Sequence, residues 1–87
     1  MKIILHKHFD KQYKKLRSRE KKRFKERRDI FLQDPYHPIL NNHALQGRYK
    51  GYRSMGITND LRVIYALINT DTAYFITIDT HSKLYSS

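Results

Sequence analysis

The residues of this chain best suited to chemistry are two histidines, an aspartate and an arginine: His43, His81, Asp60 and Arg62. Histidine exchanges protons near neutral pH because its ordinary pKa is about 6.5, so two histidines can supply a general base and a general acid. Arginine keeps its charge and presents a planar fork that fits a phosphate. These residue types suit a reaction in which protons are transferred and negative charge develops on a phosphate.

The chain around these residues predicts that they lie close together. His43 lies in a loop before the expected sheet, Asp60 in a turn, and His81 directly after the last expected strand. We therefore expect His43 and His81 to reach one cleft, and Asp60 to lie close to Arg62. Each residue also has a structural interpretation: His43 as a surface residue, Asp60 as a turn former, and Arg62 as an ion-pair partner of Asp79.

The first part of the sequence predicts one strand followed by two helices. The short apolar run that begins at Ile3 favours a strand, and Phe9 and Tyr13 have the i, i+4 spacing of one helix face. A second helix is expected to begin at a Ser18 cap. It should end at Asp34, because the residue before a proline avoids helical backbone angles.

The second part predicts a loop over residues 35–48 and then three strands, at residues 49–57, 61–68 and 73–79. Short turns between the strands indicate an antiparallel meander. The predicted fold class is α+β, in the order β-α-α-β-β-β, with two N-terminal helices on one face of a small antiparallel sheet. We expect a single domain over residues 1–87. The cleft with Arg62 is expected on the face away from the helices.

The charge of the chain is concentrated in its first part. Residues 1–34 contain 13 Lys and Arg against 5 Asp and Glu, and the whole chain has a formal net charge of +10. Such a basic surface favours a polyanionic partner such as RNA, although it also suits a solvated helical surface. The N-terminal apolar run is too short for a signal peptide or a membrane span, so we expect no membrane association and a cytoplasmic location.

Metal and disulfide chemistry are not expected. The chain has no cysteine, which excludes a disulfide framework and a Cys-ligated zinc site. His6 and His8 have the spacing of one strand face, but no third ligand is evident, so solvated histidines are the better interpretation. We therefore expect no metal and no cofactor.

Four motifs of the second half, together with the order of the elements, resemble the RelE/ParE superfamily of type II toxin–antitoxin toxins, and most of all its YafQ branch. The similarity covers essentially the whole chain, although the helical half matches only in pattern. The motifs are Asn42-His43-Ala44-Leu45-Gln46-Gly47, Tyr49-Lys50-Gly51-Tyr52-Arg53, Asp60-Leu61-Arg62-Val63-Ile64-Tyr65 and Thr80-His81-Ser82-Lys83-Leu84-Tyr85.

The resemblance implies an endoribonuclease that cleaves mRNA in the ribosomal decoding site and is silenced by a cognate antitoxin. Its partners would be the antitoxin, the mRNA and ribosomal RNA. By motif position, the implied catalytic residues are His43, Asp60, Arg62 and His81. The implied RNA-binding residues are Lys50, Arg53, Lys83 and Tyr85, of which the tyrosine can stack on a base.

One position departs from the family pattern. YafQ toxins have a further catalytic histidine three residues after Gly-Tyr-Arg, and this chain has Gly56 there. Two other functions therefore stay open: a ParE-type inhibitor of gyrase without nuclease activity, and a degenerate toxin that only binds its antitoxin. The set of His43, Asp60 and His81 favours the nuclease, because a binding inhibitor has no need of acid–base groups.

Overall fold

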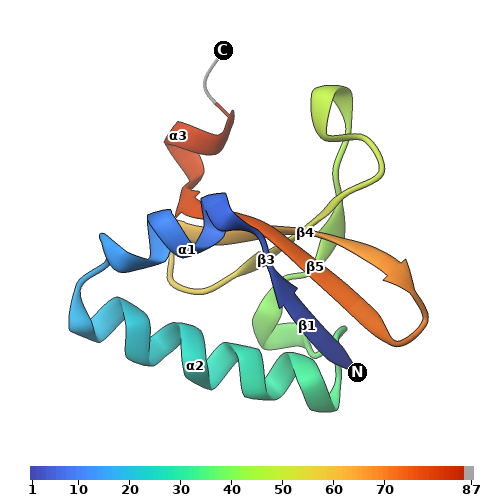
Figure 1. The fold of residues 1–87 in the computed structure, drawn as a ribbon, viewed down its shortest axis with the longest axis horizontal. Coiled ribbons are helices and arrows are strands. Elements are labelled where there is room, and N and C mark those ends of the chain that lie inside the picture. Colours follow the sequence, from blue (N-terminus) through green and yellow to red (C-terminus); the bar gives the residue numbers. More distant parts are fainter. Residues whose placement is uncertain (86–87) are drawn as a thin grey trace.

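The fold is an α+β arrangement, as predicted, in a computed structural model that describes residues 1–85 (Figure 1). Two short 3-10 helices, η1 (Pro38–Leu40) and η2 (Gly47–Tyr49), interrupt the expected loop and the first expected strand after it. The helices and strands are β1 (Lys2–Leu5), α1 (Lys7–Lys14), α2 (Ser18–Gln33), β2 (His43–Ala44), β3 (Arg53–Gly56), β4 (Leu61–Asn69), β5 (Thr72–Thr80) and α3 (His81–Tyr85).

The sheet has the strand order β1-β5-β4-β3-β2. Strands β3, β4 and β5 form the predicted antiparallel meander, and β2, which lies inside the expected loop, adds an unpredicted antiparallel strand. Strand β1 pairs with β5 in parallel. The sheet is therefore mixed, and the prediction of a purely antiparallel sheet was wrong on this point. Short turns predict antiparallel pairing only between strands that follow each other in the sequence. Two helices separate β1 from the other strands, so no turn indicated its direction relative to β5.

The main core lies between the sheet and helices α1 and α2. It contains the predicted helix residue Phe9 together with Phe24, Phe31, Tyr65 and Phe75, all of which are buried. Their rings contact one another at centroid distances of 5.1 to 6.2 Å. Such tilted and edge-to-face contacts add to the hydrophobic gain of burial, so this aromatic cluster fixes the helices against the sheet.

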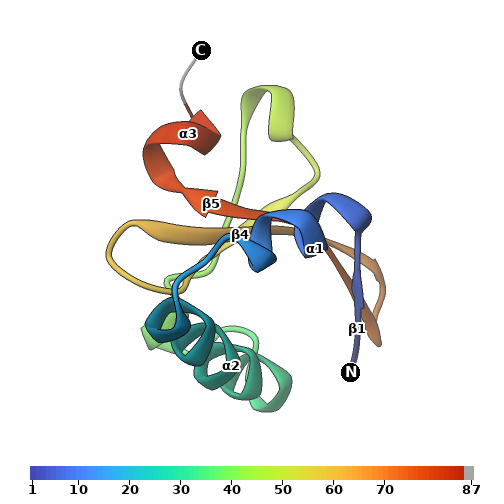
Figure 2. The ribbon, with the colours of Figure 1, turned by 60° about the vertical axis from the view of Figure 1, so that its left-hand side comes forward.

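The opposite side of the sheet is partly covered by α3 and by the segment around η2. Both project away from the sheet on the side opposite α2 (Figures 1 and 2). Leu45, Ile64 and Leu84 form a second buried cluster there, with Tyr49, Tyr52 and Tyr85 packed against it. The short helix α3 was not predicted, and it places the C-terminal motif directly over the sheet.

Two predicted boundaries need correction. The strand expected over residues 49–57 begins only at Arg53, because Gly47 and Gly51 take positive φ angles of 67° and 96° that break an extended chain. Helix α2 begins at Ser18, but its N-cap is Arg17, whose backbone N–H donates to Glu20 Oε1 at 2.9 Å. Its predicted end at Asp34 is confirmed. Among residues 1–85, no helix combines the length and the apolar character needed to cross a membrane.

Candidate active site

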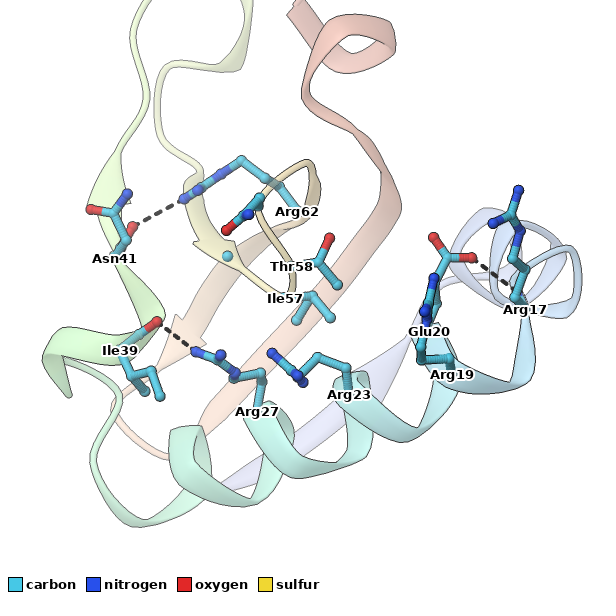
Figure 3. Close-up of a pocket in the computed structure, with 12 residues that line it drawn as sticks. Arg17, Arg19, Glu20, Arg23, Arg27, Ile39, Asn41, Ile57, Thr58 and Arg62 are labelled. Carbon is cyan, nitrogen blue, oxygen red and sulfur yellow. Dashed lines mark hydrogen bonds between the residues drawn. The ribbon is translucent and has the colours of Figure 1, made fainter.

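Arg62 is the centre of the candidate site. It lies near the start of β4 with only 9% of its surface exposed. Its Nε donates to Ser54 Oγ at 2.6 Å. Its Nη2 donates to the Asn41 carbonyl at 3.0 Å, a bond drawn in Figure 3. A Cβ atom at Gly56 would lie 3.2 Å from Nη1, so the absence of a side chain there makes room for the guanidinium. Strand β3 and the loop at Asn41 therefore hold this side chain.

The charge of Arg62 has no carboxylate partner among the described residues. Asp79 lies directly opposite on β5, but its carboxylate accepts hydrogen bonds from the Gln12 side chain and the Thr80 backbone. The alternative in which Asp79 neutralises Arg62 is therefore wrong. Burial lowers the pKa of Arg62 from its ordinary value, and the neighbouring Tyr85 opposes this shift. An unpaired, partly desolvated cation is suited to receive a phosphate.

His43 shares a hydrogen-bond acceptor with Arg62. Its Nδ1 lies 3.1 Å from the same Asn41 carbonyl oxygen. A carbonyl can only accept, so Nδ1 of His43 must carry a proton, and in the neutral ring Nε2 is then the atom that can accept one. The geometry thus defines a tautomer suited to a general base, and the ring is exposed to solvent.

The Asn41 carbonyl points at both groups because of an unusual backbone conformation. Asn41 has φ 46° and ψ 50°, in the left-handed region, and it ends η1. Asparagine tolerates this region better than other residues with a side chain. Asn41 was predicted only as part of the loop over residues 35–48, so the role of its carbonyl was not predicted.

The C-terminal motif approaches Arg62 from α3. His81 begins this helix, and its backbone N–H donates to the Asp60 carbonyl at 2.7 Å, which ties the motif to the β3–β4 turn. The rings of His81 and Tyr85 lie 4.6 Å apart between centroids. The Tyr85 hydroxyl is buried near Arg62 without a well-aligned hydrogen bond to any described residue. Contacts thus link His43, Asp60, His81 and Tyr85 around Arg62.

The other predicted RNA-binding residues lie outside this cluster or have structural contacts of their own. Arg53 Nε donates to Asn42 Oδ1 at 2.9 Å, and its guanidinium lies 5.3 Å from the centre of the Tyr36 ring. Lys50 is exposed at the end of η2, and Lys83 is exposed on α3 between His81 and Tyr85. The structure brings Lys83 near the cluster, whereas it gives Arg53 a role in holding the loop.

Asn42 extends that loop network into the core. Its Nδ2 donates to the Pro35 carbonyl at 2.7 Å and to the Tyr65 hydroxyl at 2.6 Å. Burial raises the pKa of Tyr65 above its ordinary 10.0, although the hydrogen bond with Asn42 opposes the shift. These hydrogen bonds of Asn42 therefore fix the position of the segment that contains Asn41.

An open pocket of about 640 Å³ lies between α2 and the β3–β4 turn, with Arg62 on its wall. We expected the cleft on the face away from the helices. Arg62 does contact Tyr85 of α3, which packs on that face, but the pocket also extends to α2 on the helix side. Figure 3 shows Arg62 across the pocket from the α2 side chains. The lining residues are Arg17, Arg19, Glu20, Arg23, Arg27, Ile39, Asn41, Gly56, Ile57, Thr58, Asn59 and Arg62.

Metal binding has no evident site within residues 1–85, which contain no cluster of three residues of the kinds that ligate metals. His6 and His8 are neighbours, but the His6 Nδ1 accepts the His8 backbone N–H at 2.9 Å and caps α1. This contact accounts for the spacing of the two histidines in the sequence.

Comparisons with known proteins identify the family. Residues 1–86 match the family of bacterial toxins of type II toxin–antitoxin systems named YafQ. No curated protein sequence matches the chain. Solved structures match with TM-scores from 0.68 to 0.81, and three of them illustrate the likeness.

YafQ from E. coli strain BL21(DE3) has a TM-score of 0.81 and 24% identity, with 97% of each chain covered. A YoeB/ParE toxin from Agrobacterium tumefaciens has a TM-score of 0.78 and 19% identity, covering 93% of this chain and 99% of that one. The E. coli DinJ–YafQ toxin–antitoxin complex contains a chain with a TM-score of 0.78 and 24% identity, covering 97% of this chain and 96% of that one. At these identities the likeness establishes the fold, whereas the sequence match over nearly the whole chain establishes the family. The protein belongs to the YafQ family of toxins of type II toxin–antitoxin systems.

Proposed function

We propose that this toxin is an endoribonuclease that cleaves mRNA in the ribosomal decoding site by metal-independent acid–base chemistry. The observation that supports this most is the shared Asn41 carbonyl, which joins a histidine with a defined tautomer to a buried, unpaired arginine. A protein that only binds its target has no need of such a pairing. The exposed His43 ring supplies a base and the neighbouring Arg62 supplies a fixed positive charge, and attack of a hydroxyl on a phosphate needs both.

The reaction assigns one role to each group. His43 Nε2 takes the proton of the 2′-hydroxyl, and the oxygen then attacks the adjacent phosphorus. The Arg62 guanidinium stabilises the charge that develops on the phosphate oxygens. His81, in its protonated form, donates a proton to the 5′ oxygen as the P–O bond breaks, which leaves a cyclic phosphate and a free 5′-hydroxyl.

Asp60 and Tyr85 support this centre. The Asp60 carbonyl accepts the His81 backbone N–H at 2.7 Å, and its exposed carboxylate can orient a histidine or take part in proton transfer. The Tyr85 ring packs against His81 and Tyr49, with centroid distances of 4.6 and 6.2 Å. We propose that Tyr85 positions Arg62 and His81 and stacks on a base of the RNA. Lys50, Arg53 and Lys83 would add charge along the RNA.

The proposed partners are a cognate antitoxin, mRNA and ribosomal RNA. The antitoxin is supported by the structural likeness to the toxin of the DinJ–YafQ complex. Contact with ribosomal RNA is supported by the net charge of +10 and by exposed lysines at the end of α1, among them Lys14 and Lys15. A ribosome-dependent enzyme of this kind would act in the cytoplasm.

Expression of the toxin followed by primer extension on cellular mRNA tests this proposal. We expect new 5′ ends in translated messages, relief by the antitoxin, and a loss of cleavage of about a hundredfold in His81→Ala. The matched control is His8→Ala, which removes an exposed histidine whose side chain makes no hydrogen bond to residues 1–85.

Other outcomes identify the competing functions. Growth arrest without cleaved mRNA, accompanied by inhibition of gyrase, would favour the ParE-type inhibitor. Normal growth at verified expression, with intact antitoxin binding, would favour a degenerate toxin. Wild-type cleavage by both His81→Ala and His43→Ala would refute the acid–base mechanism.

A further inference from the structure

The pocket beside α2 has a row of arginines along one wall. Arg19, Arg23 and Arg27 are four residues apart, so they lie on one face of α2 with a rise of about 6 Å between them. Figure 3 shows their side chains on the helix below Arg62, which lies on the far wall. Arg17 adds a further guanidinium at the start of the helix.

Little of this positive charge is neutralised by the protein. Within the described residues, Arg19 makes no ion pair or hydrogen bond, and Arg23 makes a single contact of 3.7 Å with Glu26. Both partners of that contact are about half exposed, and such pairs contribute little. Glu20, the one acidic residue of the lining, accepts the Arg17 backbone N–H. The pocket therefore has a strong excess of positive charge.

The basic side chains that line the pocket are arginines, and none is a lysine. The lysines of α2, Lys21, Lys22 and Lys25, do not line it, although they come from the same turns of the helix. Solubility alone does not explain why arginines line the pocket while lysines lie elsewhere on α2, because either cation keeps a surface soluble. Arginine binds the oxygens of a phosphate through two parallel N–H groups, and lysine offers only a point charge.

Arg62 makes the pocket continuous with the reaction centre. It lines the pocket, and the carbonyl that it shares with His43 belongs to Asn41, another lining residue. Thr58 and Asn59 contribute polar groups on the same wall, while Ile39 and Ile57 provide apolar surface. A chain of phosphates that reaches Arg62 from His43 can thus continue toward α2.

We propose that this pocket binds the sugar–phosphate backbone of the single-stranded RNA next to the cleaved bond, with Arg19 and Arg23 each holding a phosphate. The inference rests on the proposed nuclease function, because Arg62 belongs to both sites. An acidic segment of the antitoxin would also suit the arginines, but it would not account for the continuity with the phosphate-handling group. Arg27 has a mainly structural role, since its Nη1 donates to the Ile39 carbonyl at 2.7 Å.

Binding of a short single-stranded RNA with every 2′-oxygen methylated tests the pocket, because this RNA cannot be cleaved. Its affinity is measured by fluorescence anisotropy over a range of salt concentrations. The variant Arg19→Gln/Arg23→Gln should bind about tenfold more weakly at low salt and should lower the slope of log affinity against log salt by about 1.4. The control Lys22→Gln/Lys25→Gln removes two exposed cations from the same helix and should change affinity less than about twofold.

Three outcomes decide the proposal. Equal weakening by the two double variants would show a general charge effect and would overturn it. Unchanged RNA affinity in Arg19→Gln/Arg23→Gln, with weaker antitoxin binding, would assign the pocket to the antitoxin. A wild-type protein that binds this RNA through the pocket but cleaves no mRNA on ribosomes would refute the nuclease function and leave the pocket intact. All four substituted side chains are exposed, and thermal unfolding checks that each variant folds.

Discussion

Replacing Asn41 tests whether cleavage depends on the orientation of one backbone carbonyl, with the other groups of the active site left unchanged. This carbonyl accepts hydrogen bonds from both His43 and Arg62, and it does so because Asn41 adopts a left-handed backbone. Asn41→Gly keeps that conformation accessible, since glycine takes positive φ freely. Asn41→Val disfavours it, because a β-branched side chain clashes in the left-handed region. The two variants differ in the backbone they permit, and both lack the asparagine side chain.

The structure sets the size of the expected effect. If valine is held in the left-handed region, the strain lowers the free energy of unfolding by about 2 kcal/mol. If the backbone relaxes, the carbonyl turns away and Arg62 loses a hydrogen bond of about 1.5–3 kcal/mol, while His43 loses the acceptor that defines its tautomer. We expect relaxation and a fall in cleavage of roughly a hundredfold. Asn41→Gly should stay within about 1 kcal/mol of wild-type stability and should cleave at close to the wild-type rate.

Two measurements check this prediction. Cleavage of a defined mRNA on ribosomes, corrected for the folded fraction from thermal unfolding, gives the activity. The ¹⁵N shifts of the His43 ring report the tautomer, which should be fixed with the proton on Nδ1 in the wild type and in Asn41→Gly, and mixed in Asn41→Val. Equal cleavage by folded Asn41→Val and Asn41→Gly, with the same ring shifts, would show that the carbonyl has no positioning role.

Two further predictions concern buried polar contacts. Ser54→Ala removes the 2.6 Å partner of Arg62 Nε, so unfolding measured in urea should cost about 1–3 kcal/mol less than in the wild type and mRNA cleavage should fall, whereas the exposed Ser18→Ala should match the wild type in both assays. The pKa of Tyr65 is raised in the folded state, so the unfolded state releases the phenol proton first and the stability of the fold decreases as pH rises above the ordinary 10.0. Urea unfolding of Tyr65→Phe should therefore show a smaller loss of stability than the wild type between about pH 9 and about pH 11. An equal loss of stability in both proteins would contradict the raised pKa of Tyr65.

The elements of the fold were largely predictable because local signals agreed with the tertiary structure. Phe9 and Tyr13 have the spacing of one helix face, and Phe9 is buried against the sheet while Tyr13 packs against the same core. Strands β4 and β5 lie within about one residue of their predicted limits, since β-branched and aromatic residues dominate them. The parallel pairing of β1 was beyond local signals, because no turn constrains it and its partner is almost the whole chain away.

His43, Asp60, His81 and Tyr85 were assigned to the site from residue types and from the family resemblance, and their catalytic roles stay predictions. The contacts that join these residues to one another and to Arg62 were not predicted. Most of these contacts are made by backbone atoms, such as the Asn41 and Asp60 carbonyl oxygens. The type of a side chain does not predict where a backbone carbonyl points. The arginine row of α2 was visible as an i, i+4, i+8 spacing. It did not stand out because lysines fill the neighbouring positions.

Gly56 and the burial of Arg62 are two aspects of one arrangement. The resemblance to YafQ toxins predicts a histidine at position 56, yet in this chain the Arg62 guanidinium lies so close to the bare backbone that even a Cβ would be 3.2 Å from Nη1 and 3.5 Å from the Leu40 carbonyl. A histidine ring would need that space and would displace the cation. Cleavage of RNA requires one base, one acid and a positive charge at the phosphate. With His43 and His81 available for proton transfer, a fixed and partly desolvated arginine at this point contributes more than a third titratable ring, because a charge acts more strongly where water is excluded.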